Sequence, residues 1–537
     1  MITDNKELKK DLIIVLFLIV LSAFLRIPNY TKMAIMPDEI LNSDYAYSIL
    51  AYNWGWPPDQ MYSQPPLLPY LLAIITYLFQ GNIDIFRLVP ITFGVLDVVV
   101  IYFLGKTIYD RKVGILAAIF LAFCSFHILY SKTLMLETTL IFFILASMYF
   151  FWKTYEENSI FYAVITGILV GLGDDLKYSA LLMYTIFISY LLWIKRKGIW
   201  LDWKALFEKK FLIIIILSLL VFAPVVITFT LAGINPFYWQ LFERYQTQFA
   251  GYKSASQFGL TDLLIHGFDN YIGLLIDATP DLSKGLYIDT GSIATMSLPG
   301  SWLLLFLLAA DIILPVLILY YLYFTLKNQP RESFLFIAFL IFNVFAAIFG
   351  TRFQYYLLWN VPIFFIMLSY MTVSFAGKIR KKDFYKTSFL NKLTPVFIVL
   401  VGIFLVSYIY IGTLAPFVNE GIKVGYEKQI LKVKGTLNNS DYIFTDRPDI
   451  LYYYLNYYNM KNMQLVPLYE IVKDNGKRVR LVNLELLDQL KPKYIIVAIY
   501  SFSSYSKTND KTTISENYDL LSNEDDVLLY ERKPEQP

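Results

Sequence analysis

The chain has 537 residues, of which 57% are hydrophobic and only 17% are charged, and its formal net charge is +3. A soluble domain carries about 25% charged residues, so this composition indicates a polytopic membrane protein. The small net charge gives no argument for nucleic acid as a partner. A single cysteine excludes an intrachain disulfide and a cysteine metal cluster, and two histidines leave little room for a histidine-rich zinc site.

The N-terminal 28 residues have a basic start and an apolar core, as a signal peptide does. No small-residue cleavage site follows, so we expect a retained first helix.

Eleven apolar runs predict membrane-spanning helices, for which about 20 residues are needed. They are 11–27, 86–104, 113–131, 138–152, 159–173, 179–194, 211–232, 301–326, 333–349, 355–376 and 394–414. The run 67–79 is short and predicts a re-entrant or interfacial helix inside the first external loop.

Basic residues are distributed unevenly between the loops. The cytoplasmic set holds 21 Lys and Arg residues and the opposite set holds 7, although the opposite loops are longer in total. The cytoplasmic set is 1–10, 105–112, 153–158, 195–210, 327–332 and 377–393. The positive-inside rule then predicts a cytoplasmic N-terminus and an extracytoplasmic C-terminus. We expect the chain to be an integral protein of the plasma membrane.

Composition changes near residue 415. Short apolar runs such as "KPKYIIVA" and "DDVLLYERK" alternate with helical patterns after that point. We therefore predict a transmembrane domain over 1–414 and a small extracytoplasmic α/β domain over 415–537, in which no catalytic motif stands out. In the external loop 233–300, "YWQLFERYQTQFAGY" predicts an amphipathic helix on the membrane surface.

Five polar segments fall on the external side of the predicted topology. They are "MPDE" (36–39), "YSQPPL" (62–67), "SKTLMLE" (131–137), "GDDLKYS" (173–179) and "TRFQYY" (351–356). Polar groups at the ends of apolar helices are costly and tend to be functional. Together the segments supply carboxylates and cations, the groups needed to bind an anionic lipid headgroup and to remove a proton beside it. The carboxylates are Asp38, Glu39, Glu137, Asp174 and Asp175, and the cations are Lys132, Lys177 and Arg352.

Each of these groups also has a purely structural interpretation. Asp38 follows a proline and fits a helix N-cap. Lys132 and Glu137 fit an interfacial ion pair, and Lys177 and Arg352 fit cations that extend to lipid headgroups. Their convergence on one side of the membrane favours the functional interpretation.

In their order along the chain, these segments resemble the GT-C membrane glycosyltransferases, in the branch of protein O-mannosyltransferases and lipid A aminoarabinose transferases. The resemblance covers about residues 10–380. It is carried by "RIP", "MPDE", "PPLLPYLL", "YSKTLMLETTLIFF", "GLGDDLKYSALL" and "TRFQYYLLWNVP". It implies a polytopic α-helical enzyme of the GT-C type with a small extracytoplasmic domain.

The resemblance also implies roles for single residues. Asp38 matches the catalytic base of the first external loop, Glu39 completes the acidic pair, and Glu137 matches an acidic residue near the same site. Basic residues at Lys132, Lys177 and Arg352 would contact the donor phosphate. The chain departs from the family at Gln64, where relatives often carry Lys or His.

The implied reaction moves a sugar, as a hexosyl or pentosyl group, from a polyprenyl-phosphate carrier to an acceptor hydroxyl on a protein, lipid or glycan. A carboxylate base and cations at the leaving phosphate suit this chemistry, and direct displacement inverts the anomeric centre. Tyr45 and neighbouring aromatic residues fit either sugar stacking or an interfacial belt. A divalent cation, Mg²⁺ or Mn²⁺, held by Glu39 and Glu137 is a further expectation that the residues leave open.

Two other functions compete with this one. Asp97 and Asp311 lie within predicted spans, as in a transporter or flippase of lipid-linked intermediates, but no paired interrupted helices accompany them. The second rival is an oligosaccharyltransferase catalytic subunit. Its "WWDxG" signature does not occur in the sequence.

Overall fold

The computed structural model describes most of the helical region and much of the C-terminal region. The described ranges are 2–33, 37–51, 53–55, 65–79, 81–196, 200–231, 316–349, 358–380, 397–406, 425–437, 441–445, 464–474, 477–482, 484–498, 514–524 and 527–534, with residues 313, 395, 409, 413, 451 and 455. Residues Gln64, Arg352, Asp311 and the amphipathic segment expected in 233–300 lie outside them.

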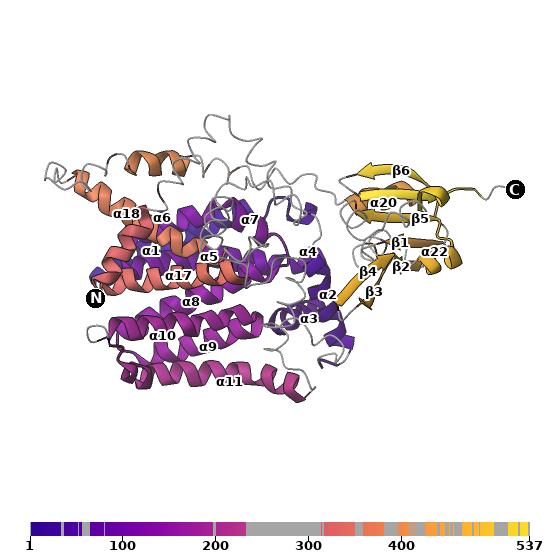
Figure 1. Ribbon diagram of the computed structural model, residues 1–537. Helices are drawn as coiled ribbons and strands as arrows, with labels where there is room; N and C mark the ends of the chain where they lie inside the picture. Colours follow the sequence, from indigo (N-terminus) through magenta and orange to yellow (C-terminus); the bar gives the residue numbers. More distant parts are fainter. Residues whose placement is uncertain are drawn as a thin grey trace. The chain divides into compact units, whose positions relative to one another are not determined.

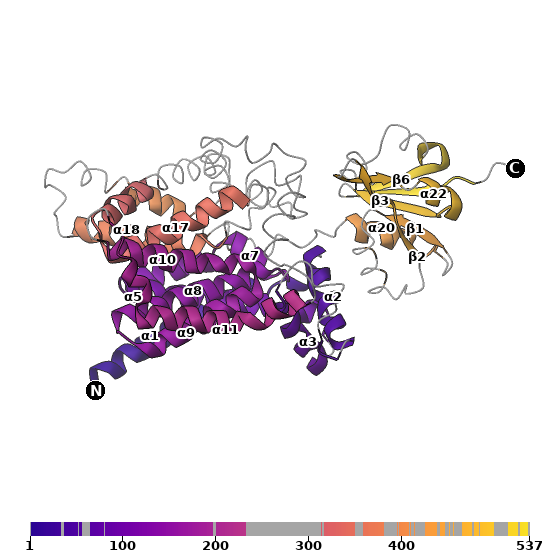
Figure 2. The same cartoon turned by 60° about the horizontal axis from the view of Figure 1, so that its bottom comes forward.

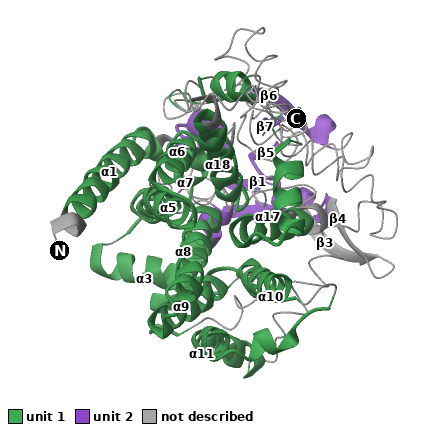
Figure 3. Cartoon of the chain, turned by 90° about the vertical axis from the view of Figure 1, so that its left-hand side faces the viewer, with its two compact units in different colours: residues 1–31, 42–285, 289–419 green, residues 32–41, 286–288, 420–537 purple. Residues whose placement is uncertain are grey.

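Two compact units make up the chain, and Figure 3 colours them separately. The first comprises residues 1–31, 42–285 and 289–419. The second comprises residues 32–41, 286–288 and 420–537.

The first unit is helical. Its long helices are α1 (Ile2–Arg26), α2 (Pro37–Ala51, from residue 42 on), α3 (Leu67–Phe79), α5 (Leu88–Ile108), α6 (Arg111–Ala122), α8 (Leu136–Glu156), α9 (Ile160–Leu176), α10 (Leu182–Ile194), α11 (Lys209–Leu231), α17 (Pro330–Phe349) and α18 (Val361–Arg380). Shorter pieces are η1 (Tyr30–Lys32), α4 (Ile83–Phe86), α7 (Ser125–Ser131), η3 (Tyr178–Leu181) and η4 (Trp203–Phe207).

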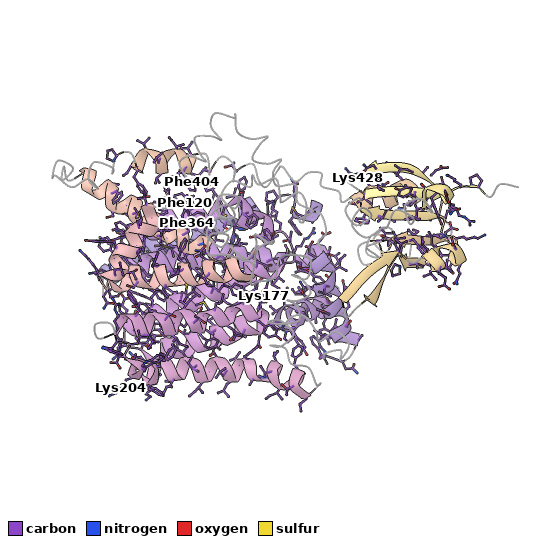
Figure 4. All side chains as sticks on the ribbon, viewed as in Figure 1. Phe120, Lys177, Lys204, Phe364, Phe404 and Lys428 are labelled. Carbon is purple, nitrogen blue, oxygen red and sulfur yellow. The ribbon has the colours of Figure 1, made fainter. Side chains whose placement is uncertain are left out.

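Helix α8 lies at the centre of the bundle, between α5 and α9 (Figures 1 and 3). Its side chains are buried along most of its length, from Leu136 to Thr154. The Phe151 ring stacks on Phe187 of α10 with 3.8 Å between ring centroids. On the other side of the bundle, Phe120 of α6 contacts Phe365 of α18, with 5.4 Å between ring centroids. Its ring centroid lies 6.1 Å from that of Phe404 (Figure 4). Inside a membrane the hydrophobic effect does not drive helices together, so close aromatic packing of this kind holds the bundle together.

Glycines allow two helix pairs to approach backbone to backbone. A Cβ on Gly114 of α6 would lie 2.4 Å from the Tyr102 carbonyl oxygen of α5. Gly167 and Gly171 of α9 face α11, where a Cβ would lie 2.8 Å from the Ile214 oxygen and 2.7 Å from the Ser218 oxygen. The two residues form a small-xxx-small pair, which is typical of close helix packing in membranes. Helices α9 and α11 run side by side in Figures 1 and 2.

A polar cluster ties the first turns of α1 to the α5–α6 turn. The Tyr102 hydroxyl donates to Asp11 Oδ1 at 2.6 Å, and Arg111 Nε donates to the same oxygen at 2.9 Å. Lys106 forms an ion pair with Asp11. These two cations and the carboxylate of Asp11 lie at the end of the bundle that the basic loops predict to be cytoplasmic.

Eleven spans are not confirmed. Within the described residues, three helical segments are long and apolar enough to cross a membrane: Ile83–Ile108, Leu136–Glu156 and Lys209–Leu231. The run 113–131, expected as one span, is two helices, α6 and α7, bent by 64° at the break. Counting that pair as one span gives four.

The second unit contains a small sheet. Its strands are β1 (Tyr442–Thr445), β2 (Gln464–Pro467), β5 (Tyr494–Ala498), β6 (Tyr518–Glu524) and β7 (Val527–Arg532), in the order β2-β1-β5-β7-β6. Strands β1, β2 and β5 are parallel, and β7 pairs antiparallel with β5 and β6. The two segments read from sequence as core strands are β5 and β7.

Helices and a hairpin accompany the sheet. They are α20 (Gly425–Val433), α22 (Leu484–Leu490) and the antiparallel pair β3 (Tyr469–Asp474) and β4 (Lys477–Val482). Gln429 of α20 donates to the Val527 carbonyl oxygen at 2.7 Å. Phe444, Ile495 and Val497 form the buried centre of this unit with Leu487 and Leu528.

Candidate active site

The acidic pair lies in the first turn of α2. Asp38 and Glu39 are its second and third residues, and they follow Pro37, whose fixed φ suits the first helical position. The Glu39 side chain is fully buried, whereas Asp38 is half-buried. Successive helical residues point about 100° apart, so the two carboxylates face different surroundings. As the second residue of α2, Asp38 lies inside the helix and is not its N-cap. A carboxylate in the first turn still interacts favourably with the positive N-terminal end of the helix dipole.

The later turns of α2 belong to the first unit. Asn42 lies one turn after Asp38 on the same face, and its amide donates to the Leu134 carbonyl oxygen at 3.1 Å. This contact ties α2 to the connection between α7 and α8. Tyr45 is buried, with 6% of its surface exposed, so a stacking role for it requires rearrangement.

Glu137 and Lys177 form a buried ion pair. Glu137 is the second residue of α8, and Lys177 caps the C-terminus of α9, 40 positions later. Their side chains are 1% and 14% exposed. Figure 4 places Lys177 toward the end of the bundle opposite to Lys204. In the structure Lys177 contacts Glu137, whereas the structural interpretation of Lys177 expected a contact with lipid headgroups.

Trp359 lies over the same lysine. It lies two residues before the first residue of α18, is fully buried, and its ring centroid is 5.6 Å from the Lys177 ammonium. A desolvated cation over an indole face is stabilised by the ring quadrupole. Sequence reasoning missed Trp359, although "LWNVP" was part of the resemblance.

Lys132 is buried at the end of α7. Its ammonium donates to the Pro28 carbonyl oxygen, just beyond α1, at 2.6 Å. Burial, with a smaller contribution from the positive charge of Arg26, lowers the pKa of Lys132 to about 8. Lys132 therefore titrates much nearer neutral pH than an ordinary lysine.

Two further carboxylates end α9. Asp174 is buried and accepts from the Tyr184 hydroxyl at 2.8 Å, and Asp175 follows it directly. Among the described residues, Oδ1 of each carboxylate has no hydrogen-bond partner. Asp174 and Asp175 precede Lys177 by three and two residues. The C-terminal end of α9 therefore carries hydrogen-bond acceptors beside a cation.

Trp54 is one of the aromatic residues that follow Tyr45 along the chain. It is exposed, has a φ of 68°, and packs edge-on against Tyr77 of α3 with 5.7 Å between ring centroids. No group of three or more His, Cys, Asp or Glu residues within the described ranges is spaced to hold a metal ion. The site described so far therefore consists of buried cations and carboxylates at one end of the helical unit.

The family model described as Dolichyl-phosphate-mannose-protein mannosyltransferase matches residues 63–228. That stretch contains Lys132, Glu137 and Lys177. No curated protein matches the chain.

Solved membrane enzymes share the fold. ArnT from Cupriavidus metallidurans bound to undecaprenyl phosphate is 11% identical, with a TM-score of 0.54 over 98% of each chain. The Archaeoglobus fulgidus oligosaccharyltransferase in the apo form is 13% identical, with a TM-score of 0.57 over 98% of this chain and 74% of that one. AglB from the same organism, in complex with an inhibitory peptide and a dolichol-phosphate, is 14% identical, with a TM-score of 0.53 over 98% of this chain and 75% of that one.

These matches confirm the resemblance to GT-C glycosyltransferases read from the sequence. At such identities the structures show a common fold and assign no role to a residue.

Proposed function

We propose that the chain is a glycosyltransferase that moves a sugar from a polyprenyl-phosphate-linked donor to an acceptor hydroxyl on the extracytoplasmic face. The observation that carries the proposal is the gathering of Lys132, Lys177 and Glu137 at one bundle end, inside the region that matches the mannosyltransferase model. Buried cations at helix ends suit a lipid phosphate, which approaches from the bilayer.

The kind of donor and acceptor follows from the related folds. Undecaprenyl phosphate and dolichol-phosphate are bound by two of those proteins, and an inhibitory peptide by one. For this chain we propose a polyprenyl-phosphate sugar as donor, with a protein, lipid or glycan hydroxyl as acceptor.

Asp38 is proposed as the base. As the acceptor oxygen bonds to the anomeric carbon, its proton passes to the Asp38 carboxylate, and the bond from that carbon to the phosphate oxygen breaks. The phosphate leaves with both electrons of that bond and remains on the prenyl carrier. Attack from the side opposite to the leaving group inverts the anomeric centre.

The cations stabilise the leaving phosphate. Negative charge grows on its oxygens in the transition state, and preorganised ammonium and guanidinium groups in a dry site lower its energy. Lys132 and Lys177 are proposed for this role, with Arg352 and Gln64. Glu137 holds Lys177 in place, because a lysine without a fixed partner has a flexible stem.

A Mg²⁺ or Mn²⁺ ion held by Glu39 and Glu137 fits the structure poorly. The Glu137 carboxylate is already in direct contact with the Lys177 ammonium, which would have to move away before a cation could bind. The proposed steps therefore use side chains alone. Transfer that stops on addition of EDTA and returns with Mg²⁺ or Mn²⁺ would reinstate the metal.

The test uses purified protein and a labelled polyprenyl-phosphate sugar. Asp38→Asn keeps size and removes the base, so turnover should fall by about 10²–10⁴-fold while donor binding persists. Asp44→Asn, on the exposed side of the same helix, is the matched control and should keep wild-type turnover. Near-normal turnover in Asp38→Asn would show that Asp38 is not the base.

The same preparation separates an enzyme from a transporter. Reconstituted in vesicles, a flippase moves labelled lipid across the bilayer and leaves the sugar on its carrier. Label that appears on the acceptor supports the transferase, and movement without transfer rejects it.

A further inference from the structure

Three buried ionisable side chains from three different helices contact one another near Lys132. Arg26 of α1, Asp97 of α5 and His127 of α7 are all fully buried. The proposed reaction gives them no role. Ionisable groups inside a membrane bundle are costly to bury and mark functional positions.

Arg26 caps the broken end of α6. Its guanidinium donates to the carbonyl oxygens of Leu121 and Ala122, both at 3.3 Å. These carbonyls belong to the last turn of α6, just before the chain bends by 64° into α7, and the Leu121 oxygen also accepts from the Cys124 N–H at 3.3 Å. A cation at a helix C-terminus also suits the helix dipole. The guanidinium thus stabilises the bend.

His127 links Arg26 to Asp97. Arg26 Nη2 lies 2.8 Å from His127 Nδ1, and His127 Nε2 lies 3.0 Å from Asp97 Oδ2. Because a guanidinium can only donate, Nδ1 accepts, which assigns the proton of the neutral ring to Nε2. Nε2 then donates to the carboxylate. The three side chains therefore fix the rotation of α7 about its axis.

Close packing holds the same face of α7 one turn later, where Ser131 Oγ lies 3.3 Å from His127 Nδ1. A Cβ on Gly94, three residues before Asp97, would lie 2.4 Å from Ser131 Oγ. Ser131 also donates to the His127 carbonyl oxygen at 2.5 Å. The residue after Ser131 is Lys132, so any rotation of α7 displaces Lys132 directly. Pro28, which accepts from Lys132, lies two residues after Arg26.

We propose that Arg26, His127 and Asp97 act as positioning residues that set the ammonium of Lys132 for the donor phosphate. The inference rests on the proposed function, because it takes Lys132 as a phosphate ligand. None of the three needs to touch the substrate. They hold α7 at its break, and α7 holds Lys132.

The experiment measures binding of undecaprenyl phosphate and of dolichyl phosphate to the purified full-length chain. His127→Leu removes both contacts of the ring, and we expect binding about tenfold weaker, because a displacement of about 1 Å in a charged contact has effects of this order or larger. Lys132→Ala weakens binding too. The double variant should bind no more weakly than Lys132→Ala, since the three positioning residues then have no ammonium to position.

Ser147→Ala is the matched control. Ser147 is buried in α8 and its hydroxyl donates only within its own helix, to Ile144 at 2.9 Å. It should bind both lipids as the wild type does. The KM for the acceptor, measured in the transfer assay, should stay unchanged in His127→Leu. A general loss of structure would instead change the KM values of both the donor and the acceptor.

If the His127→Leu protein does not fold, two more conservative substitutions test the same inference. The amide of His127→Asn overlays Nδ1 and keeps the Arg26 contact, whereas that of His127→Gln overlays Nε2 and keeps the Asp97 contact. Each should weaken lipid phosphate binding less than Lys132→Ala does.

The outcomes are distinguishable. The inference alone is overturned if His127→Leu, or both amide variants, bind lipid phosphate as tightly as the wild type. It is also overturned if the losses of affinity in His127→Leu and Lys132→Ala multiply in the double variant. A wild-type chain that binds neither lipid phosphate overturns the proposed function, and the inference with it.

Discussion

Glu137 and Lys177 depend on each other, because each keeps the other's charge from being buried alone. Breaking a buried ion pair on one side costs about 3–5 kcal/mol, whereas replacing both partners with uncharged residues is often neutral. Glu137→Gln or Lys177→Met alone should therefore lower the melting temperature in detergent, and the double variant should recover most of the loss.

The pair Lys195–Glu208 provides the control for this prediction. Its side chains are 41% and 29% exposed, so the pair is much more solvated than Glu137 and Lys177, whose side chains are 1% and 14% exposed. Glu208→Gln should change stability by less than about 1 kcal/mol. Equal effects at the two pairs would contradict the burial argument.

The lowered pKa of Lys132 predicts a pH dependence of donor use. With a pKa of about 8, its charged fraction falls from about nine tenths at pH 7 to about one tenth at pH 9. Only the ammonium attracts phosphate, so donor KM should rise across this interval. A phosphodiester donor does not titrate there.

Lys132→Arg supplies the control, because a guanidinium stays charged throughout that range. Its donor KM should be flat from pH 7 to 9. A wild-type profile that is equally flat would show that Lys132 does not bind the donor in its charged form.

At the scale of elements, the contact between α9 and α11 should tolerate no added methyl group. Gly171→Ala places a Cβ 2.6 Å from the Val221 Cβ and 2.7 Å from the Ser218 oxygen, so the helices must separate. We expect destabilisation of about 1–3 kcal/mol, as for other overpacked sites.

Gly377→Ala in α18 is the matched change, because nothing lies within 4 Å of its Cβ. There alanine should stabilise by about 0.5–1 kcal/mol through helix propensity. Thermal melts of the two variants should shift in opposite directions. A stabilised Gly171→Ala would contradict the close approach of the two backbones.

At the scale of the whole molecule, the asymmetry of basic residues predicts that the C-terminus is extracytoplasmic. A reporter that is active only in the cytoplasm, fused after Pro537, should be inactive. A second fusion after Lys197, in a basic loop, should be active and serves as its control. An active C-terminal fusion would mean an even number of spans.

The sequence predicted where charges gather better than how they pair. Some apolar runs coincide with helices, such as 138–152 with α8, and polar residues at the ends of such runs marked Lys132, Glu137 and Lys177. No local pattern gives the partner of Glu137, because Lys177 is 40 positions away and is brought near by the packing of α8 on α9. Pair geometry of this kind belongs to tertiary structure.

The break between α6 and α7 shows the same limit. The run 113–131 contains no proline and is uniformly apolar near residues 119–124, so it reads as one span. At the bend, a guanidinium from α1, 95 residues earlier, donates to the Leu121 carbonyl oxygen in the last turn of α6. His127 and Asp97 were visible as polar residues in apolar runs, and only the structure joins them.

The ion pair between α8 and α9 also constrains how this sequence can evolve. A lineage that lost one charge would carry the other, buried and uncompensated, until a second substitution followed. Drift at positions 137 and 177 should therefore proceed by paired exchange, either to swapped charges or to two uncharged residues. Among descendants of a common ancestor, the two positions should covary more strongly than either does with its neighbours along the chain.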